Sequence, residues 1–239
     1  MVESRHRTRG IKRAATLVAL ASLALLTWRA SAHDDHADPG GHALYPSPAA
    51  VASARFEPPA PGSYELPVIE RIASHSLLGP SGLPESLLAL GHGELALVSF
   101  VYLQCDEACP LSTALLHDLD RELAKDGDLA GRVELVTVSF DPERDRPEQM
   151  AALRERMAPQ GRWRFLTAKD EAGLRPVLAD FGQDAVWIPG GKNAPDALRH
   201  VLKVFLVDAS GAVRQIYSTG FLDLRLVLAD LRTLFPTAP

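Results

Sequence analysis

The sequence LALVSFVYLQCDEACP occupies residues 95–110 and changes character halfway along. Residues 95–103 are almost continuously apolar and rich in β-branched and aromatic side chains, which predicts a central strand buried on both faces. A helix is expected to follow, because Pro110 suits a first helical turn and leucines then recur at helical spacing. These leucines are Leu111, Leu115, Leu116, Leu119 and Leu123. Cys105 and Cys109 therefore lie at a predicted strand-to-helix junction.

Strand and helix patterns alternate around this junction, which predicts an α/β layered domain. The predicted strands cover residues 64–69, 95–103, 133–140, 163–166, 200–207 and 213–217. The helix after Pro110 is followed by predicted helices at 145–157, 171–181 and 222–234. Asp145 and Glu148 flank Pro147 and are interpreted as a capping box. The sequence DASG at 208–211 predicts the turn of a late antiparallel hairpin.

The overall composition suits one sizeable domain with a tail. The 239 residues are 46% hydrophobic and carry a formal net charge of −5. A chain of this length can bury one core, and its 18 prolines leave room for a tethering segment. A phosphate-binding face needs Lys and Arg in clear excess, so nucleic acid is not expected as a partner.

The N-terminal part of the chain has the pattern of an export signal. Basic residues precede an apolar run at 14–28, and Ala30-Ser31-Ala32 then supplies a cleavage motif, which predicts a signal peptide over residues 1–32. A retained membrane anchor is the alternative, although the run is shorter than the ~20 residues that cross a bilayer comfortably. Residues 33–62 lack periodicity and are interpreted as a linker rich in Ala, Pro and His. The folded domain is expected at 63–239, in a periplasmic or other extracytoplasmic compartment.

The two cysteines are interpreted as a chemical pair. They are the only cysteines of the chain, and they enclose a loop too small for a disulfide to remove much chain entropy. Residues four apart on a helical turn face the same way, so both sulfurs can address one point if helix begins near them. A helix N-terminus favours thiolates, and soft sulfur donors select copper(I) or zinc. An added imidazole suits copper in either oxidation state.

His200 is the best placed of the eight histidines to be a third ligand. The pattern makes it the first residue of a strand that can return beside the strand at 95–103. The alternative is a solvated histidine at a strand end. His75 and His92 lie in turn-rich segments, and His117 falls away from the leucine stripe of its helix. These three histidines are interpreted as solvated.

A second group of histidines lies in the linker. Cleavage after Ala32 would expose the α-amine of His33 near His36 and His42. An amine with imidazoles can bind copper(II), so an auxiliary copper(II) site is one interpretation. A polar linker that happens to contain histidines is the other, and composition favours it.

Three sequence elements resemble the Sco/SenC family of copper-binding proteins. They are FVYLQCDEACP at 100–110, VSFDPERDRP at 138–147, and a histidine before VFLVDASG at 204–211. The similarity extends from Tyr64 to Leu234. It implies a thioredoxin-like fold, with a central mixed sheet flanked by helices, in which Cys105, Cys109 and His200 bind copper.

The resemblance also implies that Asp141 lies near the metal without being a main ligand. Asp-Pro sequences initiate turns, and Asp145 with Glu148 can cap a helix, so turn and cap chemistry explains the same segment equally well.

The leading hypothesis for the function is an exported copper metallochaperone, an assembly factor more than an enzyme. The resemblance implies delivery to a respiratory copper enzyme, with a cytochrome c oxidase subunit as the client. The alternative is a thiol-disulfide oxidoreductase that reduces the cysteines of a client copper protein through redox-active Cys105 and Cys109. Disulfide exchange needs only the cysteines, whereas a stable three-ligand site also needs His200.

Overall fold

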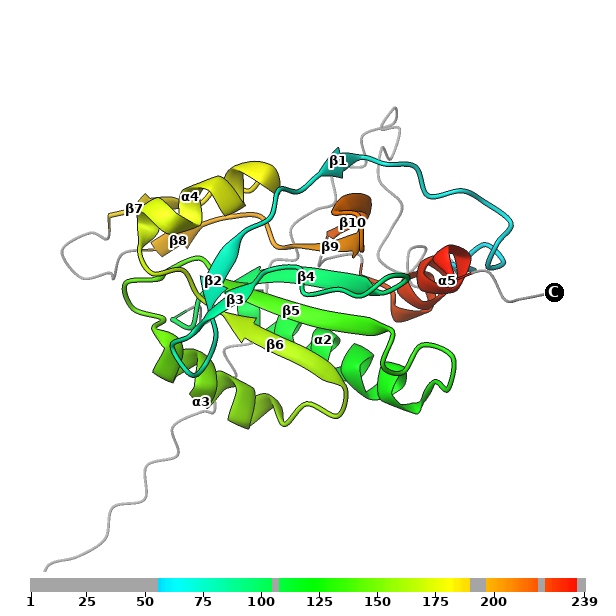
Figure 1. Cartoon of the computed structure of the whole chain (residues 1–239), viewed down its shortest axis with the longest axis horizontal. Helices are drawn as coiled ribbons and strands as arrows, with labels where there is room; N and C mark the ends of the chain where they lie inside the picture. Colours follow the sequence, from blue (N-terminus) through cyan, green and yellow to red (C-terminus); the bar gives the residue numbers. More distant parts are fainter. Residues whose placement is uncertain (1–55, 105–107, 190–196, 219–221, 236–239) are drawn as a thin grey trace, which may run out of the picture. The chain divides into compact units, whose positions relative to one another are not determined.

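Six strands form a mixed sheet (Figure 1). In spatial order they are β1 (Glu70–Arg71), β10 (Ala212–Ser218), β9 (Lys203–Asp208), β4 (Leu95–Val101), β5 (Val133–Ser139) and β6 (Arg162–Leu166). The strands β4, β5 and β6 run parallel, whereas β9 is antiparallel to β4 and β10 is antiparallel to β9. The predicted α/β fold with a central mixed sheet is therefore confirmed.

This computed structural model describes residues 56–104, 108–189, 197–218 and 222–235, with the backbone alone at 108–112, Ala197 and Arg199. Residues from Phe56 onward belong to one compact unit. The predicted signal peptide, the linker histidines His33, His36 and His42, and Cys105 lie outside the described residues. Within the described part of the chain, no helix has both the length and the apolar character needed to span a membrane.

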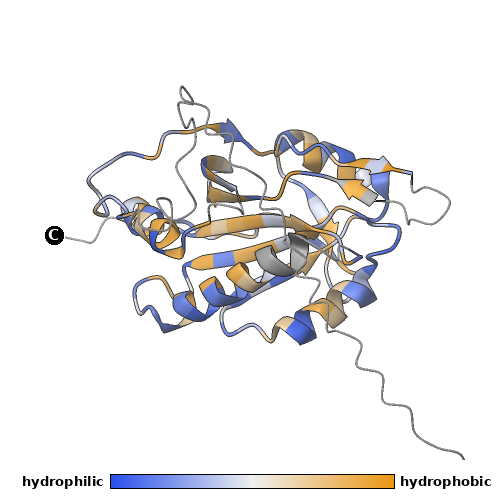
Figure 2. Cartoon of the chain, turned by 180° about the vertical axis from the view of Figure 1, so that it is seen from behind, coloured by the Kyte–Doolittle hydropathy of each residue, from blue (hydrophilic) through white to orange (hydrophobic). Residues whose placement is uncertain are grey.

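Helices cover both faces of the sheet. They are α2 (Ala108–Lys125), α3 (Pro147–Met157), α4 (Glu171–Asp180) and α5 (Leu224–Leu234). One core lies between the sheet and α2, α3 and α5, and includes Leu97 of β4 and Leu119 of α2. A second core on the opposite face joins Val98 of β4 to Val177 of α4. Figure 2 shows the hydrophobic residues concentrated along the central strands that these helices cover.

Burial on both faces explains the continuous apolar runs. All seven residues of β4 and all seven of β5 are buried. Because alternate residues of a strand point to opposite faces, a strand with a core on each side needs apolar side chains at almost every position. The sequence pattern of residues 95–103 thus has a direct structural cause.

Short strands differ from the prediction. The prediction of a strand at 64–69 is wrong: these residues form no strand, and the two-residue β1 comes only after them. The carbonyl oxygen of Leu66 instead accepts a hydrogen bond of 2.8 Å from the Arg214 side chain. Two small hairpins were not predicted: β2 (Ser76–Leu78) with β3 (Pro84–Ser86), and β7 (Val186–Ile188) with β8 (Ala197–Arg199). His200 follows β8 and does not begin a strand, since β9 starts at Lys203.

The predicted capping box is wrong. The N-cap residue of α3 is Arg146, Pro147 occupies the first helical turn, and no side chain caps this end. The helix therefore begins one residue later than the capping-box interpretation requires. By contrast, the side chain of Asp170 caps α4 by accepting a hydrogen bond of 2.8 Å from the Gly173 amide.

Candidate metal centre

The cysteine pair belongs to the connection between β4 and α2. The helix α2 begins at Ala108, so Cys109 lies in its first turn, as the sequence predicts. Cys105 and the side chain of Cys109 are outside the described residues. The unpaired amide groups and the dipole of a helix N-terminus favour the thiolate form of a cysteine, which is the form that binds metals.

His200 lies between two aromatic rings that follow the central strands. Its ring stacks on Phe140 with centroids 4.7 Å apart and an interplanar angle of 15°. It meets Tyr102 edge-on at 5.4 Å and 84°. Phe140 comes directly after β5, and Tyr102 comes directly after β4, three residues before Cys105. The imidazole is therefore held at the end of the sheet where the cysteine-bearing connection begins.

The imidazole of His200 has no hydrogen-bond partner among the described residues. Both ring nitrogens are shielded from solvent, and neither forms a hydrogen bond to another described residue. Burial lowers the pKa of His200, which favours the neutral ring with a free lone pair. Buried polar atoms are nearly always satisfied, so these two nitrogens differ from those of a solvated histidine.

Asp141 is buried in the turn that follows β5, where it is 3% exposed. Its carboxylate forms an ion pair of 2.8 Å with Arg144. The guanidinium of Arg144 in turn lies 4.6 Å from the centroid of Trp187. Trp187 meets Tyr102 at a centroid distance of 6.2 Å, and Tyr102 contacts His200. Asp141 is thus linked to His200 through a series of side chains.

Asp145 has partners that the sequence interpretation missed. Its Oδ2 atom accepts a hydrogen bond of 3.0 Å from the Leu103 amide and one of 2.7 Å from the Ser139 hydroxyl. The signal that points away from capping is Pro147, because proline favours the first helical position and so assigns the N-cap to Arg146. Nothing in the local pattern indicates the contact with Leu103.

The three histidines that the sequence predicts to be solvated differ in how exposed they are. His75 is not solvated as predicted, because its side chain is only 12% exposed and its Nε2 lies 2.8 Å from Asp180. His75 lies in the segment directly before β2, and its contact with Asp180 attaches that segment to the end of α4. His92 is exposed, as predicted, and His117 is half-buried in the wall of a cavity beside Leu103. Among the described residues, no group of three or more His, Cys, Asp or Glu side chains is arranged to hold a metal ion.

The SCO1/SenC family model matches residues 89–235, more than half of the chain. The chain belongs to the SCO1/SenC family. Its sequence is 28% identical over 128 residues to the SCO1 protein homolog of Bacillus subtilis. That match covers 53% of this chain and 63% of the Bacillus subtilis protein, so it spans less than two thirds of the relative. The predicted family is therefore confirmed.

Solved structures confirm the thioredoxin-like fold of this SCO1/SenC protein. Bradyrhizobium japonicum ScoI with copper bound superimposes with a TM-score of 0.56 at 23% identity, over 68% of this chain and 98% of ScoI. BsSco, described as a member of the Sco family of cytochrome c oxidase assembly proteins with a disulfide switch, gives the same TM-score of 0.56 at 23% identity. It covers 77% of this chain and 100% of BsSco. At these identities the likeness establishes the fold.

The chemistry of His200 in this SCO1/SenC protein fits a site for copper. A neutral imidazole suits copper in either oxidation state, and cysteine thiolates are soft donors. A copper ion bound to His200 would satisfy a ring nitrogen that has no hydrogen bond to another described residue.

Proposed function

We propose that this protein is an exported copper metallochaperone that binds copper through Cys105, Cys109 and His200. The observation that carries the proposal is the half-buried imidazole of His200, whose two ring nitrogens are shielded from solvent and form no hydrogen bond to another described residue. The ring lies at the end of β4, from which the chain continues to Cys105. Support also comes from the shared fold with ScoI, which holds copper.

The donor set explains how the protein can hold copper and still release it. Two thiolates bind copper(I), and the imidazole adds a donor that copper(II) requires. Transfer to a client needs a ligand that can be displaced without unfolding the protein. His200 meets this need, because it lies in the short connection between β8 and β9 rather than inside a strand of the main sheet.

Asp141 is proposed to support the metal centre without binding the ion. Its carboxylate already forms an ion pair with Arg144, so this carboxylate has a partner other than the metal. Through Trp187 and Tyr102, this pair restrains the rings that surround His200. Its role is then to hold the imidazole in place.

The client is proposed to be a respiratory copper enzyme, with the copper site of a cytochrome c oxidase subunit as the target. BsSco, which shares the fold, is described as belonging to a family of cytochrome c oxidase assembly proteins. Export through residues 1–32, with 33–62 as a linker and 63–239 as the copper-binding domain, places the protein in the extracytoplasmic compartment. Mass spectrometry of exported protein should find a chain that begins at His33. A membrane-bound chain that retains Met1 would indicate an anchor instead.

The second candidate function is that of a thiol-disulfide oxidoreductase. The disulfide switch described for BsSco, which shares the fold, supports this candidate. In this reaction the two thiols become one disulfide, while the client disulfide takes up two electrons and two protons. The reaction has no need for His200. Two shielded ring nitrogens of His200 that form no hydrogen bond to another described residue therefore favour copper binding.

The decisive experiment replaces His200 with Ala and compares it with His92→Ala, which alters an exposed histidine. We expect His200→Ala to weaken copper(II) binding by more than about 100-fold, beyond the effect of losing a group that only orients a ligand. Copper(I) binding and dithiol chemistry should largely remain, and His92→Ala should match the wild type. Double replacement of Cys105 and Cys109 by Ser should abolish binding of both ions.

Two outcomes would overturn the proposal. If His200→Ala kept the copper(II) affinity and optical spectrum of the wild type, His200 would not be a ligand. If the wild type bound no copper but reduced a client disulfide through its cysteines, the oxidoreductase candidate would replace the metallochaperone.

A further inference from the structure

We infer that Asp145 is a positioning residue that ties the cysteine-bearing connection to the strand end supporting His200. The inference rests on the proposed function, because it concerns the geometry of the same copper site. A single carboxylate oxygen, Oδ2, accepts both the Leu103 amide at 3.0 Å and the Ser139 hydroxyl at 2.7 Å. Leu103 is two residues before Cys105, so its backbone sets where the connection leaves the sheet.

The second partner links the same oxygen to the histidine side of the site. Ser139 is the last residue of β5, and the next residue, Phe140, stacks on His200 at 4.7 Å. The Ser139 hydroxyl also accepts a hydrogen bond of 2.9 Å from the Asp141 amide. Asp145 therefore fixes the end of β5 relative to Leu103, which lies two residues before Cys105.

Helix capping does not explain why the carboxylate of Asp145 is buried. Asp145 is only 2% exposed, and burying a carboxyl group costs free energy unless hydrogen bonds replace its lost contacts with water. Burial raises the pKa of Asp145, against the opposing effect of the Ser139 and Leu103 hydrogen bonds. The helix that follows receives no side-chain cap. The two bonds to Oδ2 join segments that are separated by 42 and 6 residues in sequence.

The chain offers a matched control in Asp120 on α2. This carboxylate is 1% exposed and also accepts two hydrogen bonds, from the amides of Gln160 at 2.7 Å and Gly161 at 3.0 Å. Those amides precede β6, so Asp120 ties down a loop at the opposite ends of the parallel strands. Replacement of either aspartate should destabilise the fold, but only Asp145 should affect the site.

The experiment compares full-length Asp145→Ala, Asp145→Asn and Asp120→Ala with the wild type. Asp145→Ala should change the copper(II) absorption and electron paramagnetic resonance spectra and weaken copper(II) binding by about 10–100-fold. Asp145→Asn should restore binding to within a few-fold, because one carbonyl oxygen can accept both bonds that Oδ2 accepts. Asp120→Ala should lower the melting temperature and leave spectra and affinity unchanged.

A second readout separates this inference from the proposed function. If the wild type binds no copper, the proposed function fails, and the thiol-disulfide equilibrium of the cysteine pair becomes the measurement. Asp145→Ala should then shift the equilibrium constant about tenfold relative to Asp120→Ala, or ~30 mV in midpoint potential. If Asp145→Ala does not fold, Ser139→Ala removes one of the two bonds and should shift the same readouts in the same direction. Unchanged spectra, affinity and potential in a folded variant would overturn the positioning role.

Discussion

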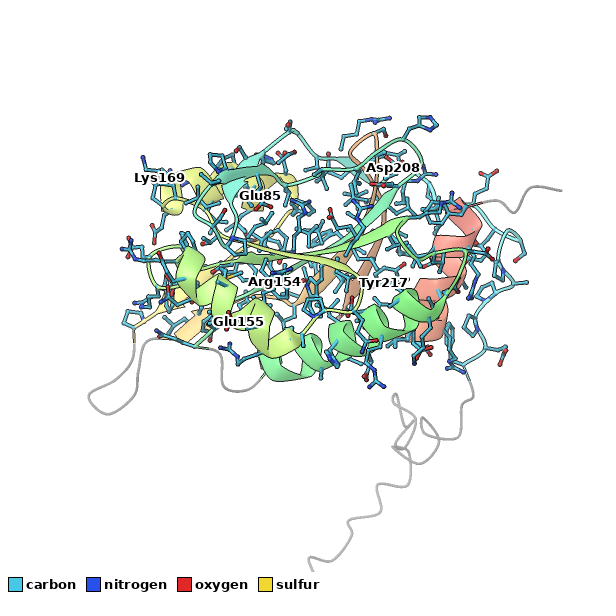
Figure 3. The ribbon with its side chains drawn as sticks, turned by 60° about the horizontal axis from the view of Figure 1, so that its bottom comes forward. Glu85, Arg154, Glu155, Lys169, Asp208 and Tyr217 are labelled. Carbon is cyan, nitrogen blue, oxygen red and sulfur yellow. The ribbon has the colours of Figure 1, made fainter. Side chains whose placement is uncertain are left out.

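The carboxylate of Asp230 joins three parts of the fold through two tyrosines. The Tyr217 hydroxyl of β10 donates to it at 2.8 Å, and the Tyr64 hydroxyl of the N-terminal segment donates at 2.5 Å. Burial raises the pKa of Tyr217, which keeps its hydroxyl protonated and able to donate. Tyr217 lies in the interior, in the core shared by β10 and α5 (Figure 3).

Tyr217→Phe should lower the free energy of unfolding by about 1–3 kcal/mol, because it leaves a buried carboxylate short of a partner. Tyr64→Phe should cost less, about 0.5–1.5 kcal/mol, since Tyr64 is half-buried and water can replace its hydroxyl. Urea denaturation of the three proteins measures both values. A larger loss for Tyr64→Phe would contradict this ranking.

Phe140 is the side chain that most directly orients His200. Phe140→Leu keeps an apolar side chain but removes the stacked ring, so copper(II) affinity should fall about tenfold. Phe165→Leu makes the same change in the core on the other face, at a residue that contacts Trp163. Chelator competition should show wild-type affinity for Phe165→Leu. Equal losses of affinity in both variants would mean that general loosening, not the ring stack, is responsible.

The C-terminus of α3 contains a strained residue. Ala158 has φ 44° and ψ 57°, in the left-handed region that favours glycine. Ala158→Gly should therefore stabilise the protein by about 1 kcal/mol, which corresponds to about 2–4 °C in melting temperature. Ala152→Gly, at an exposed position inside the same helix, should instead cost about 1 kcal/mol. A lower melting temperature for Ala158→Gly would show that the strain is absent.

The segment before β2 is attached to α4 through Asp180. The Ala73 amide donates to its carboxylate at 2.8 Å and His75 contacts it at 2.8 Å, and these bonds lower the pKa of Asp180. A carboxyl group with a lowered folded pKa adds stability above its unfolded pKa of about 3.9, and that stability is lost as the pH falls through the folded pKa.

Asp180→Ala should thus lower the free energy of unfolding by about 1 kcal/mol at pH 5, and the difference from the wild type should shrink below about pH 4. Asp184→Ala, at an exposed position, should follow the wild type throughout. Chemical denaturation at a series of pH values provides the comparison. A difference that grew towards lower pH would reverse the expected sign.

At the scale of the whole molecule, residues 56–239 form a unit with cores on both faces of its sheet. A protein comprising these residues should unfold cooperatively and bind copper with the affinity of the longer chain. Calorimetry and copper titration test this expectation. A higher copper(II) stoichiometry in a chain starting at His33 would establish the auxiliary site at His33, His36 and His42, and loss of cooperative folding would show that the preceding residues stabilise the unit.

The main strands and helices were predictable because their causes are local or periodic. Two-sided burial requires the apolar runs of β4 and β5, and leucines at helical spacing form the buried stripe of α2. The DASG turn also follows from local chemistry, since Gly211 has φ 78° and Asp208 accepts a hydrogen bond of 2.9 Å from the Ser210 amide. The order of cysteine, aspartate and histidine motifs likewise identified the family before any contact was known.

The surroundings of the candidate site depend on contacts between residues that are far apart in the chain. The stacking of His200 on Phe140 and the bond from Leu103 to Asp145 arise only when strand ends and loops meet, and the same holds for the contact of His75 with Asp180 elsewhere in the fold. Residue type and spacing show which groups can bind a metal or cap a helix. Which of them lose their water and find a particular partner is set by packing, because the cost of burying a polar group depends on everything around it.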